Sequence, residues 1–184
     1  MNSALKIVSV AASTAISLSE AKNHLKVENT ADDDLITILI KAAQDEVESF
    51  TNRTLIATTF DFQLMKFPDC CIELPVAPVA SITSIKYYNT ENNEQTWSSE
   101  NYFYSISEIP FKIRYVDSIP ETYPDRFDAI NVRFVSGYEN AAAVPDALKQ
   151  AILLLIGDMY DNRGDAPRER FTMWKMLTYP FKLF

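Results

Sequence analysis

The sequence predicts an α+β protein, in which a discontinuous helical domain of about four helices carries an inserted antiparallel β module. Apolar residues recur at helical spacing in residues 30–50 and 144–160, whereas between 57 and 135 they alternate with polar residues at the period of a strand. No helix-length connection separates the strands, so antiparallel pairing is the economical arrangement. The expected domains are residues 1–56 together with 140–184 for the helical core, and residues 57–139 for the inserted β module.

Two helices are expected near the N-terminus, after an extended arm. Ser17 and Glu20 have the spacing of a capping box, which predicts a short helix ending near Leu25 or Val27. The acidic run 32–34 favours the start of a second helix, because carboxylates interact favourably with the positive end of the helix macrodipole. The core-facing stripe of this helix is Leu35, Ile36, Leu39, Ile40, Ala43, Val47 and Phe50, and its charged residues Lys41, Asp45, Glu46 and Glu48 are expected mostly toward solvent or a partner.

The β module is expected to contain several short strands. Phe60, Phe62 and Leu64 alternate with polar residues, and Ile72 and Leu74 continue after a Pro-Asp turn. Prolines and the polar run 89–95 mark the connections between strands. Further strands are expected at residues 82–88, 102–106, 111–116 and 130–135.

The last long helix is apolar on most of its circumference. Pro145 occupies a position near the helix start, where a missing N–H is tolerated. One face carries Leu148, Ala151, Ile152, Leu155, Ile156 and Met159, while Leu153 and Leu154 make the opposite side apolar. Such a helix must be covered on several sides, by its own chain or by a neighbour, and an aromatic-rich tail follows it. The candidate assembly-interface residues are Leu153, Leu154, Phe171, Trp174, Tyr179, Phe181 and Phe184.

The order of several short motifs resembles a known family. Strand 132–136 is followed by Gly137-Tyr138, by a Val-Pro-started helix that contains Lys-Gln-Ala-Ile, and by Tyr-x-Asn-Arg at 160–163. Residues 18–27, the Phe-Thr-Asn-Arg-Thr at 50–54 and the Met-Leu-Thr-Tyr-Pro at 176–180 agree with the same pattern. Together they resemble the head-tail connector family of tailed bacteriophages, whose members are also called adaptor or head completion proteins.

The resemblance implies a structural virion protein without catalytic activity. It would form a ring of about a dozen copies beneath the portal, through which DNA passes and to which neck or tail components attach. The implied partners are other copies of the chain, the portal protein, a head-closure or tail-completion protein, and double-stranded DNA in passive contact with the lumen. The implied location is the virion neck, after assembly in the host cytoplasm.

Composition excludes several other classes. The net charge of −8, with 17 basic against 25 acidic residues, argues against a protein that binds nucleic acid by neutralising phosphates. Three glycines cannot build a phosphate-cradling loop, and the only histidine, His24, has no nearby metal-ligand pattern. The adjacent cysteines Cys70 and Cys71 are too few for structural zinc and fit a reducing compartment. We therefore expect no cofactor, no metal and no membrane insertion.

Two alternatives remain open at the level of the sequence. One is a soluble binding module of unknown ligand that uses the β insert. The other is an enzyme with a carboxylate-only site, for which Asp158 and Asp161 would be candidates. Their neighbours alternate in sign, which is more typical of solvated or intersubunit ion pairs.

Overall fold

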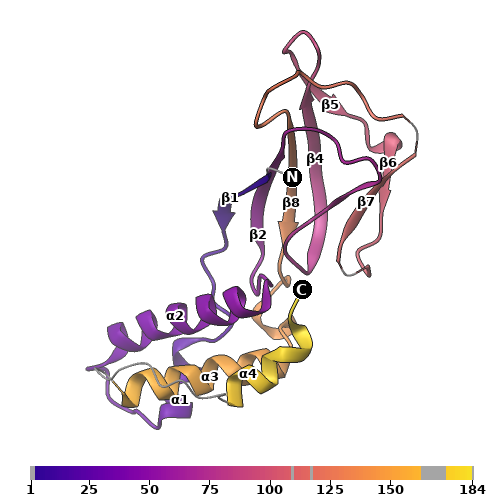
Figure 1. The fold of residues 1–184 in the computed structure, drawn as a ribbon. Coiled ribbons are helices and arrows are strands. Elements are labelled where there is room, and N and C mark those ends of the chain that lie inside the picture. The colour runs from indigo at the N-terminus through magenta and orange to yellow at the C-terminus, as the bar shows by residue number, and fades with distance from the viewer. Residues whose placement is uncertain (1–2, 109, 117, 163–172, 184) are drawn as a thin grey trace. The chain divides into compact units, whose positions relative to one another are not determined.

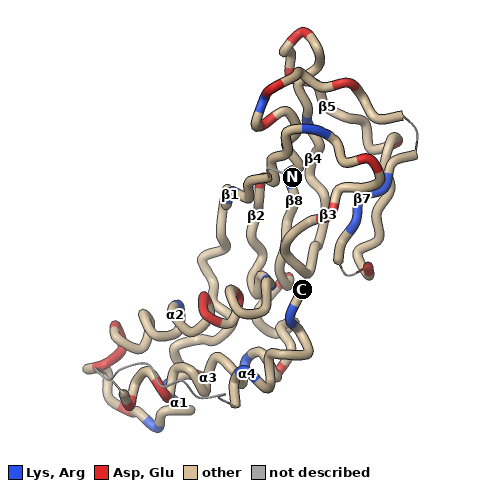
Figure 2. Tube along the Cα trace, in the orientation of Figure 1, with Lys and Arg blue, Asp and Glu red and all other residues tan. Residues whose placement is uncertain are grey.

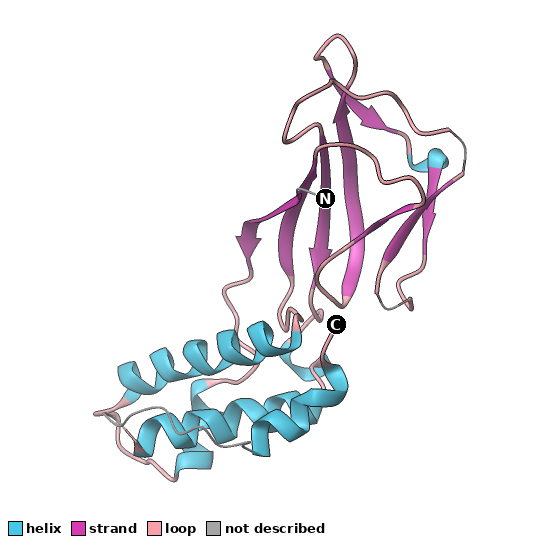
Figure 3. Ribbon diagram, in the orientation of Figure 1, coloured by secondary structure: helices cyan, strands magenta, loops and turns pink. Residues whose placement is uncertain are grey.

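The computed structural model describes residues 3–108, 110–116, 118–162 and 173–183. The chain divides into two compact units. The β unit consists of Met1–Ala11 and Ala57–Gly137, and the helical unit consists of Ala12–Ile56 and Tyr138–Phe184. Figures 1 and 3 show the α-helices in one unit and the strands in the other, which confirms the α+β fold class.

The helical unit contains the long helices and the C-terminal tail. Its elements are α1 (Leu18–Leu25), α2 (Asp33–Thr51), the 3₁₀ turn η2 (Ala141–Ala143), α3 (Asp146–Asp161), α4 (Met173–Thr178) and the 3₁₀ turn η3 (Tyr179–Phe181). The capping box at α1 is confirmed: the Ser17 side chain accepts a hydrogen bond from the Glu20 N–H, and the Glu20 carboxylate accepts one from the Ser17 N–H at 2.8 Å. No helix in the described parts of the chain is long and apolar enough to cross a membrane.

Helices α2 and α3 form the core of this unit. They run antiparallel, since the Tyr160 hydroxyl near the end of α3 donates a hydrogen bond to Asp32 before the start of α2, at 2.6 Å. Ile36 and Ile40 of α2 and Leu148 and Ile152 of α3 are buried, as the helical spacing predicted. The last turn of α2 differs from the expectation, because Glu48 is half-buried and accepts a hydrogen bond from the Leu55 N–H at 2.8 Å instead of facing solvent.

The start of α2 also differs in detail from the capping hypothesis. The Asp32 side chain makes no cap hydrogen bond to the helix and instead accepts from Tyr160. Asp33 forms a 2.5 Å ion pair with Lys22 of α1. The first-turn carboxylates Asp33 and Asp34 still lie at the positive end of the helix macrodipole, while the side chains of 32 and 33 bind neighbouring helices.

The β unit contains two sheets. A five-stranded sheet has the order β1-β2-β8-β4-β5, and a three-stranded sheet has the order β3-β7-β6. All of these strand pairs are antiparallel. The strands are β1 (Ser3–Val10), β2 (Thr58–Leu64), β3 (Cys71–Glu73), β4 (Val79–Tyr88), β5 (Glu94–Trp97), β6 (Tyr102–Tyr104), β7 (Lys112–Tyr115) and β8 (Ile130–Ser136), with a 3₁₀ turn η1 (Ser99–Asn101) before β6.

One apolar cluster fills the β unit. Phe60 of β2 stacks on Phe134 of β8 with ring centroids 5.5 Å apart, and Phe67 meets Trp97 edge-on at 4.9 Å. On their opposite face, β2 and β8 are polar except at Val135, and there Arg133 donates two hydrogen bonds of 2.7 Å to Asp61. The period-two pattern therefore separates a core face from a polar face.

Two strands were not expected from the sequence. Residues 3–10 form β1 on the edge of the larger sheet, in register with β2 and with a bulge between Ile7 and Ser9, although an extended arm belonging to the helical domain 1–56 was expected. All eight residues of β1 are exposed. The segment therefore lacks the alternation of buried and exposed positions from which a strand is predicted. Similarly, β5 begins inside the polar run 89–95 that was interpreted as a connection, and only its last residue, Trp97, is buried.

Candidate assembly surface

The C-terminal tail covers the end of α2 with its inner face. Trp174 is only 7% exposed and meets the Phe50 ring edge-on, with centroids 5.3 Å apart. The Leu183 N–H donates to the Thr51 carbonyl at 2.9 Å, and the Asn52 amide donates back to the Leu183 carbonyl at 3.2 Å. Within α4, the buried Thr178 hydroxyl donates a hydrogen bond to the Trp174 carbonyl. This inner face is therefore part of the fold of the helical unit.

The outer face of the tail is apolar and exposed. Met173, Met176 and Tyr179 recur every third residue and are 61%, 56% and 54% exposed. Because residues three apart lie on one side of a helical turn, these side chains form a single stripe. We call this stripe, together with the flanking Lys175 and Lys182, the tail surface.

The tail surface is basic as well as apolar. Lys182 lies over the Phe50 ring at 4.6 Å, Lys175 lies 5.4 Å from the Trp174 ring, and Arg53 lies over Phe181 at 5.8 Å. Arg53 also donates a hydrogen bond to the Phe181 carbonyl. No acidic residue occurs in residues 173–183. The rings of Phe50 and Trp174 attract the half-buried Lys175 and Lys182 toward the end of α2.

The sequence-derived interface residues fall into three groups. Tyr179 lies on the exposed outer stripe, whereas Trp174 is buried and Phe181 is half-buried. Leu153 and Leu154 are half-buried on α3, which packs against both α2 and α4. Phe171 and Phe184 lie outside the described residues. A role in assembly for all of these residues stays a prediction.

Sequence reasoning missed the two methionines of the tail surface. The tail was interpreted as one aromatic-rich segment, so its residues were not separated by face. Spacing alone would have separated them, because 173, 176 and 179 follow one line along the helix whereas 174 and 178 follow another. Which of the two faces is buried depends on Phe50, which is remote in sequence.

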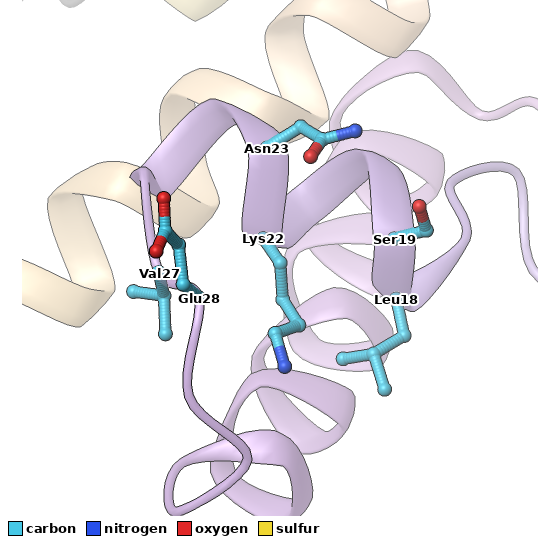
Figure 4. A pocket seen from close by; sticks show the side chains of 6 residues that line it. All are labelled: Leu18, Ser19, Lys22, Asn23, Val27 and Glu28. Carbon is cyan, nitrogen blue, oxygen red and sulfur yellow. The ribbon is translucent and has the colours of Figure 1, made fainter.

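We searched the described parts of the chain for a small-molecule pocket and for a metal site. A depression of about 590 Å³ beside α1 is lined by Leu18, Ser19, Lys22, Asn23, Val27 and Glu28 (Figure 4). Its only cation, Lys22, is already engaged by Asp33 and by the Asn29 carbonyl at 2.8 Å. Among the described residues, no group of three or more His, Cys, Asp or Glu could hold a metal ion.

The pKa values of two carboxyl groups are shifted in opposite directions. Hydrogen bonds from the Arg133 guanidinium lower the pKa of Asp61 in the β unit. Burial raises the pKa of Glu48 in the helical unit, even though the Leu55 N–H partly offsets the effect by binding the charged form. The candidate pair Asp158 and Asp161 is exposed on α3, where Asp158 accepts a hydrogen bond from the Asn162 side chain at 3.0 Å. This exposed setting does not resemble the desolvated site in which a carboxylate acts as a general acid.

An exposed apolar stripe of this kind is typical of surfaces that bind other proteins. The family model that describes the Phage gp6-like head-tail connector protein matches residues 15–130. This match covers more than half of the chain, which therefore belongs to that family and is a structural connector protein of a virion. A comparison with curated proteins gives no match.

Solved structures share the whole fold. A chain of the neck of an empty GTA particle, computed with C6 symmetry, has a TM-score of 0.84 at 21% identity, with 98% of this chain and 96% of that chain covered. A chain of the neck of a native GTA particle, computed with C12 symmetry, gives 0.82 at 21% identity with coverages of 98% and 96%. A chain from the virion of a native gene transfer agent particle gives 0.83 at 21% identity with coverages of 98% and 95%.

Proposed function

We propose that this protein forms a multi-copy ring in the neck of a virion, beneath the portal, where DNA passes through its lumen and head-closure or tail components attach. The observation that carries the proposal is the family match over residues 15–130, together with a fold shared over 98% of the chain with neck proteins of gene transfer agent particles. Those particles were computed with C6 and C12 symmetry. A cyclic arrangement of this chain is the corresponding expectation.

Surface chemistry supports a docking role without catalysis. A connector needs exposed surfaces that fit preformed parts, and the tail surface provides an apolar stripe with a basic border. Cyclic rings use heterologous contacts, in which one surface of a subunit meets a different surface of its neighbour. The tail surface is a candidate for one side of such a contact, either with a neighbouring copy or with the portal.

The net negative charge of the chain supports the passage of DNA through the ring. Lumen residues that neutralised phosphates would release counterions and hold the duplex, whereas a net acidic subunit leaves it mobile. The chain carries −8 overall, and Figure 2 shows acidic residues on both units. Single changes at Asp158 or Asp161 should be mild, because the field that DNA experiences is a sum over many charges.

Electron microscopy of particles from a phage lacking this protein tests the proposal. We expect heads that package DNA but fail to retain it or to attach tails, with complementation by the full chain restoring tailed virions. Normal tailed virions with full-length DNA in the absence of the protein would contradict the connector function. In that outcome, a binding module that acts outside the virion would become the better explanation.

A further inference from the structure

The exposed side of α2 has the features of a second docking surface. Ile38 is 63% exposed in the middle of the helix. Residues 34, 38, 41, 42 and 45 are all on the side opposite the buried Ile36, Ile40, Ala43 and Val47. We call Asp34, Ile38, Lys41, Ala42, Asp45 and Glu46 the α2 outer face. Ile38 and Ala42 give this side of the helix an apolar centre with a charged rim, the arrangement that protein contacts have on a larger scale.

The α2 outer face is acidic. It contains the carboxylates Asp34, Asp45 and Glu46 against the single cation Lys41. All four of these charged residues are exposed. Within the described residues, the salt bridges of the helical unit involve only Lys22 and Asp33, so the three carboxylates of this face have no ion-pair partner there. They are available to a cationic partner.

The tail surface has the complementary character. It contains Lys175 and Lys182 and lies beside Arg53, and residues 173–183 include no acid. Its apolar stripe of Met173, Met176 and Tyr179 can pack around one exposed Ile, since Met side chains adapt to irregular apolar partners. Two tail surfaces facing each other would instead bring like charges together, which disfavours a symmetric tail-to-tail contact.

The positions of the two surfaces permit a head-to-tail contact. Both α2 and α4 pack against α3. Ile38 of α2 and the stripe Met173, Met176 and Tyr179 are exposed, while Lys175 and Lys182 are half-buried beside the Phe50 ring. One subunit can therefore offer the tail surface to one neighbour and the α2 outer face to the other. A contact between two different surfaces of identical subunits is heterologous and closes into a ring when the rotation between subunits permits it.

From this complementarity of charge and apolar surface we propose that the tail surface of one copy docks on the α2 outer face of a neighbouring copy. The inference rests on the proposed ring and names the two surfaces that build it. Charge-reversal variants of the full chain test it. One variant reverses the tail with Lys175→Glu and Lys182→Glu, a second reverses α2 with Asp34→Lys and Asp45→Lys, and a third combines all four changes.

Ring formation is measured by native mass spectrometry on purified protein, and attachment to portal-bearing heads is measured by quantitative blotting. Each separate reversal should lower ring yield about tenfold or more, because it places like charges in a contact. The combined variant should regain ring formation with itself and should fail to co-assemble with the original chain. Glu100→Lys with Glu121→Lys, two exposed acids of the β unit, is the charge-matched control for the α2 reversal and should assemble normally.

A crosslinking measurement does not depend on charge. In a Cys70→Ser, Cys71→Ser background, Ile38→Cys with Met176→Cys should give a ladder of covalent oligomers with a bismaleimide. Either single cysteine should give none beyond background, because a heterologous contact never brings two copies of one position together. Thermal melting of every variant shows whether the helical unit has remained folded.

The outcomes separate the inference from the proposed function. Rings that form equally well with both reversals, without a crosslink ladder, would overturn the paired surfaces and leave the connector function intact. Loss of head attachment with the tail reversal alone, while the α2 reversal behaves as the control does, would assign the tail to the portal and also overturn the inference. If the original chain neither forms rings nor attaches to heads, the proposed function fails, and the inference fails with it.

Discussion

The two units close their apolar cores in different ways. In the β unit, two sheets enclose Phe60 and Phe134 among strands that are all inside the unit. In the helical unit, the end of α2 is covered by Trp174 from a short tail whose other face is exposed. In the helical unit, one segment therefore contributes both to the buried core and to the tail surface for which we propose a role in assembly. Substitutions can test this difference unit by unit.

The largest effect is expected in the core of the β unit. Phe134→Ala removes a fully buried ring that stacks on Phe60 and should cost about 3–5 kcal/mol of unfolding free energy, measured by denaturant titration. Phe127→Ala, which changes an exposed ring of the same unit, is the control and should stay within about 0.5 kcal/mol. Comparable losses from the two substitutions would contradict the assignment of the core.

The second-largest effect is expected in the helical unit, where the inner and outer faces of the tail should respond differently to substitution. Trp174→Ala should cost about 3 kcal/mol, because it uncovers Phe50, and it should also lower attachment to portal-bearing heads. Met176→Ala changes the exposed face of the same helix and should leave melting nearly unchanged while it lowers attachment. If Met176→Ala destabilised the protein as strongly as Trp174→Ala, the inner and outer faces of the tail would be wrongly assigned.

A third effect concerns the ion pair of the β unit. Asp61→Asn removes the charge that accepts two hydrogen bonds from Arg133, and it should cost about 1.5–3 kcal/mol at pH 7. Because the pKa of Asp61 is lowered in the folded state, its stabilisation is present above the unfolded pKa of about 4 and is lost as the pH falls through the folded value. The variant should therefore lose less stability between pH 5 and pH 2 than the original chain.

A smaller effect of opposite sign is expected at Glu48. Burial raises the pKa of Glu48, so the folded state binds a proton more readily than the unfolded state, and stability falls as the pH rises from about 4.3 through the folded pKa. Glu48→Gln keeps an oxygen for the Leu55 N–H without the charge and should raise the melting temperature at pH 7 but not at pH 3.5. Glu46→Gln, on the exposed side of the same helix, is the control. A lower melting temperature for Glu48→Gln at pH 7 would be the contrary result.

The smallest effect is expected from chelation. Neither unit contains a metal-ligand cluster in the parts that the structure describes. A metal bound to the native state would raise stability by mass action, so a chelator should leave the melting of both units unchanged. A drop of several degrees in melting temperature that one added metal reverses would show a structural metal site.

Sequence patterns determined most of the regular elements and indicated the family. Helical spacing located α2 and α3, the Ser17–Glu20 capping box located α1, and alternation located β2 and β8, because each pattern reflects a period imposed by the local backbone. The motif order from residue 18 to residue 180 indicated the head-tail connector family. The periodic patterns and the capping box are local, so neighbouring residues are sufficient to reveal them.

Tertiary structure decided which residues face inward where no local sequence pattern predicts burial. Strand β1 has no buried alternation and exists because it pairs with β2, which lies about fifty residues later in the chain. Glu48 is half-buried because its carboxylate accepts a hydrogen bond from the Leu55 N–H beyond the end of α2. The tail divides into a buried Trp174 and an exposed Met176 because Phe50, more than a hundred residues away in sequence, covers only one side of it. Burial depends on partners that are remote in sequence, and only the folded chain brings them together.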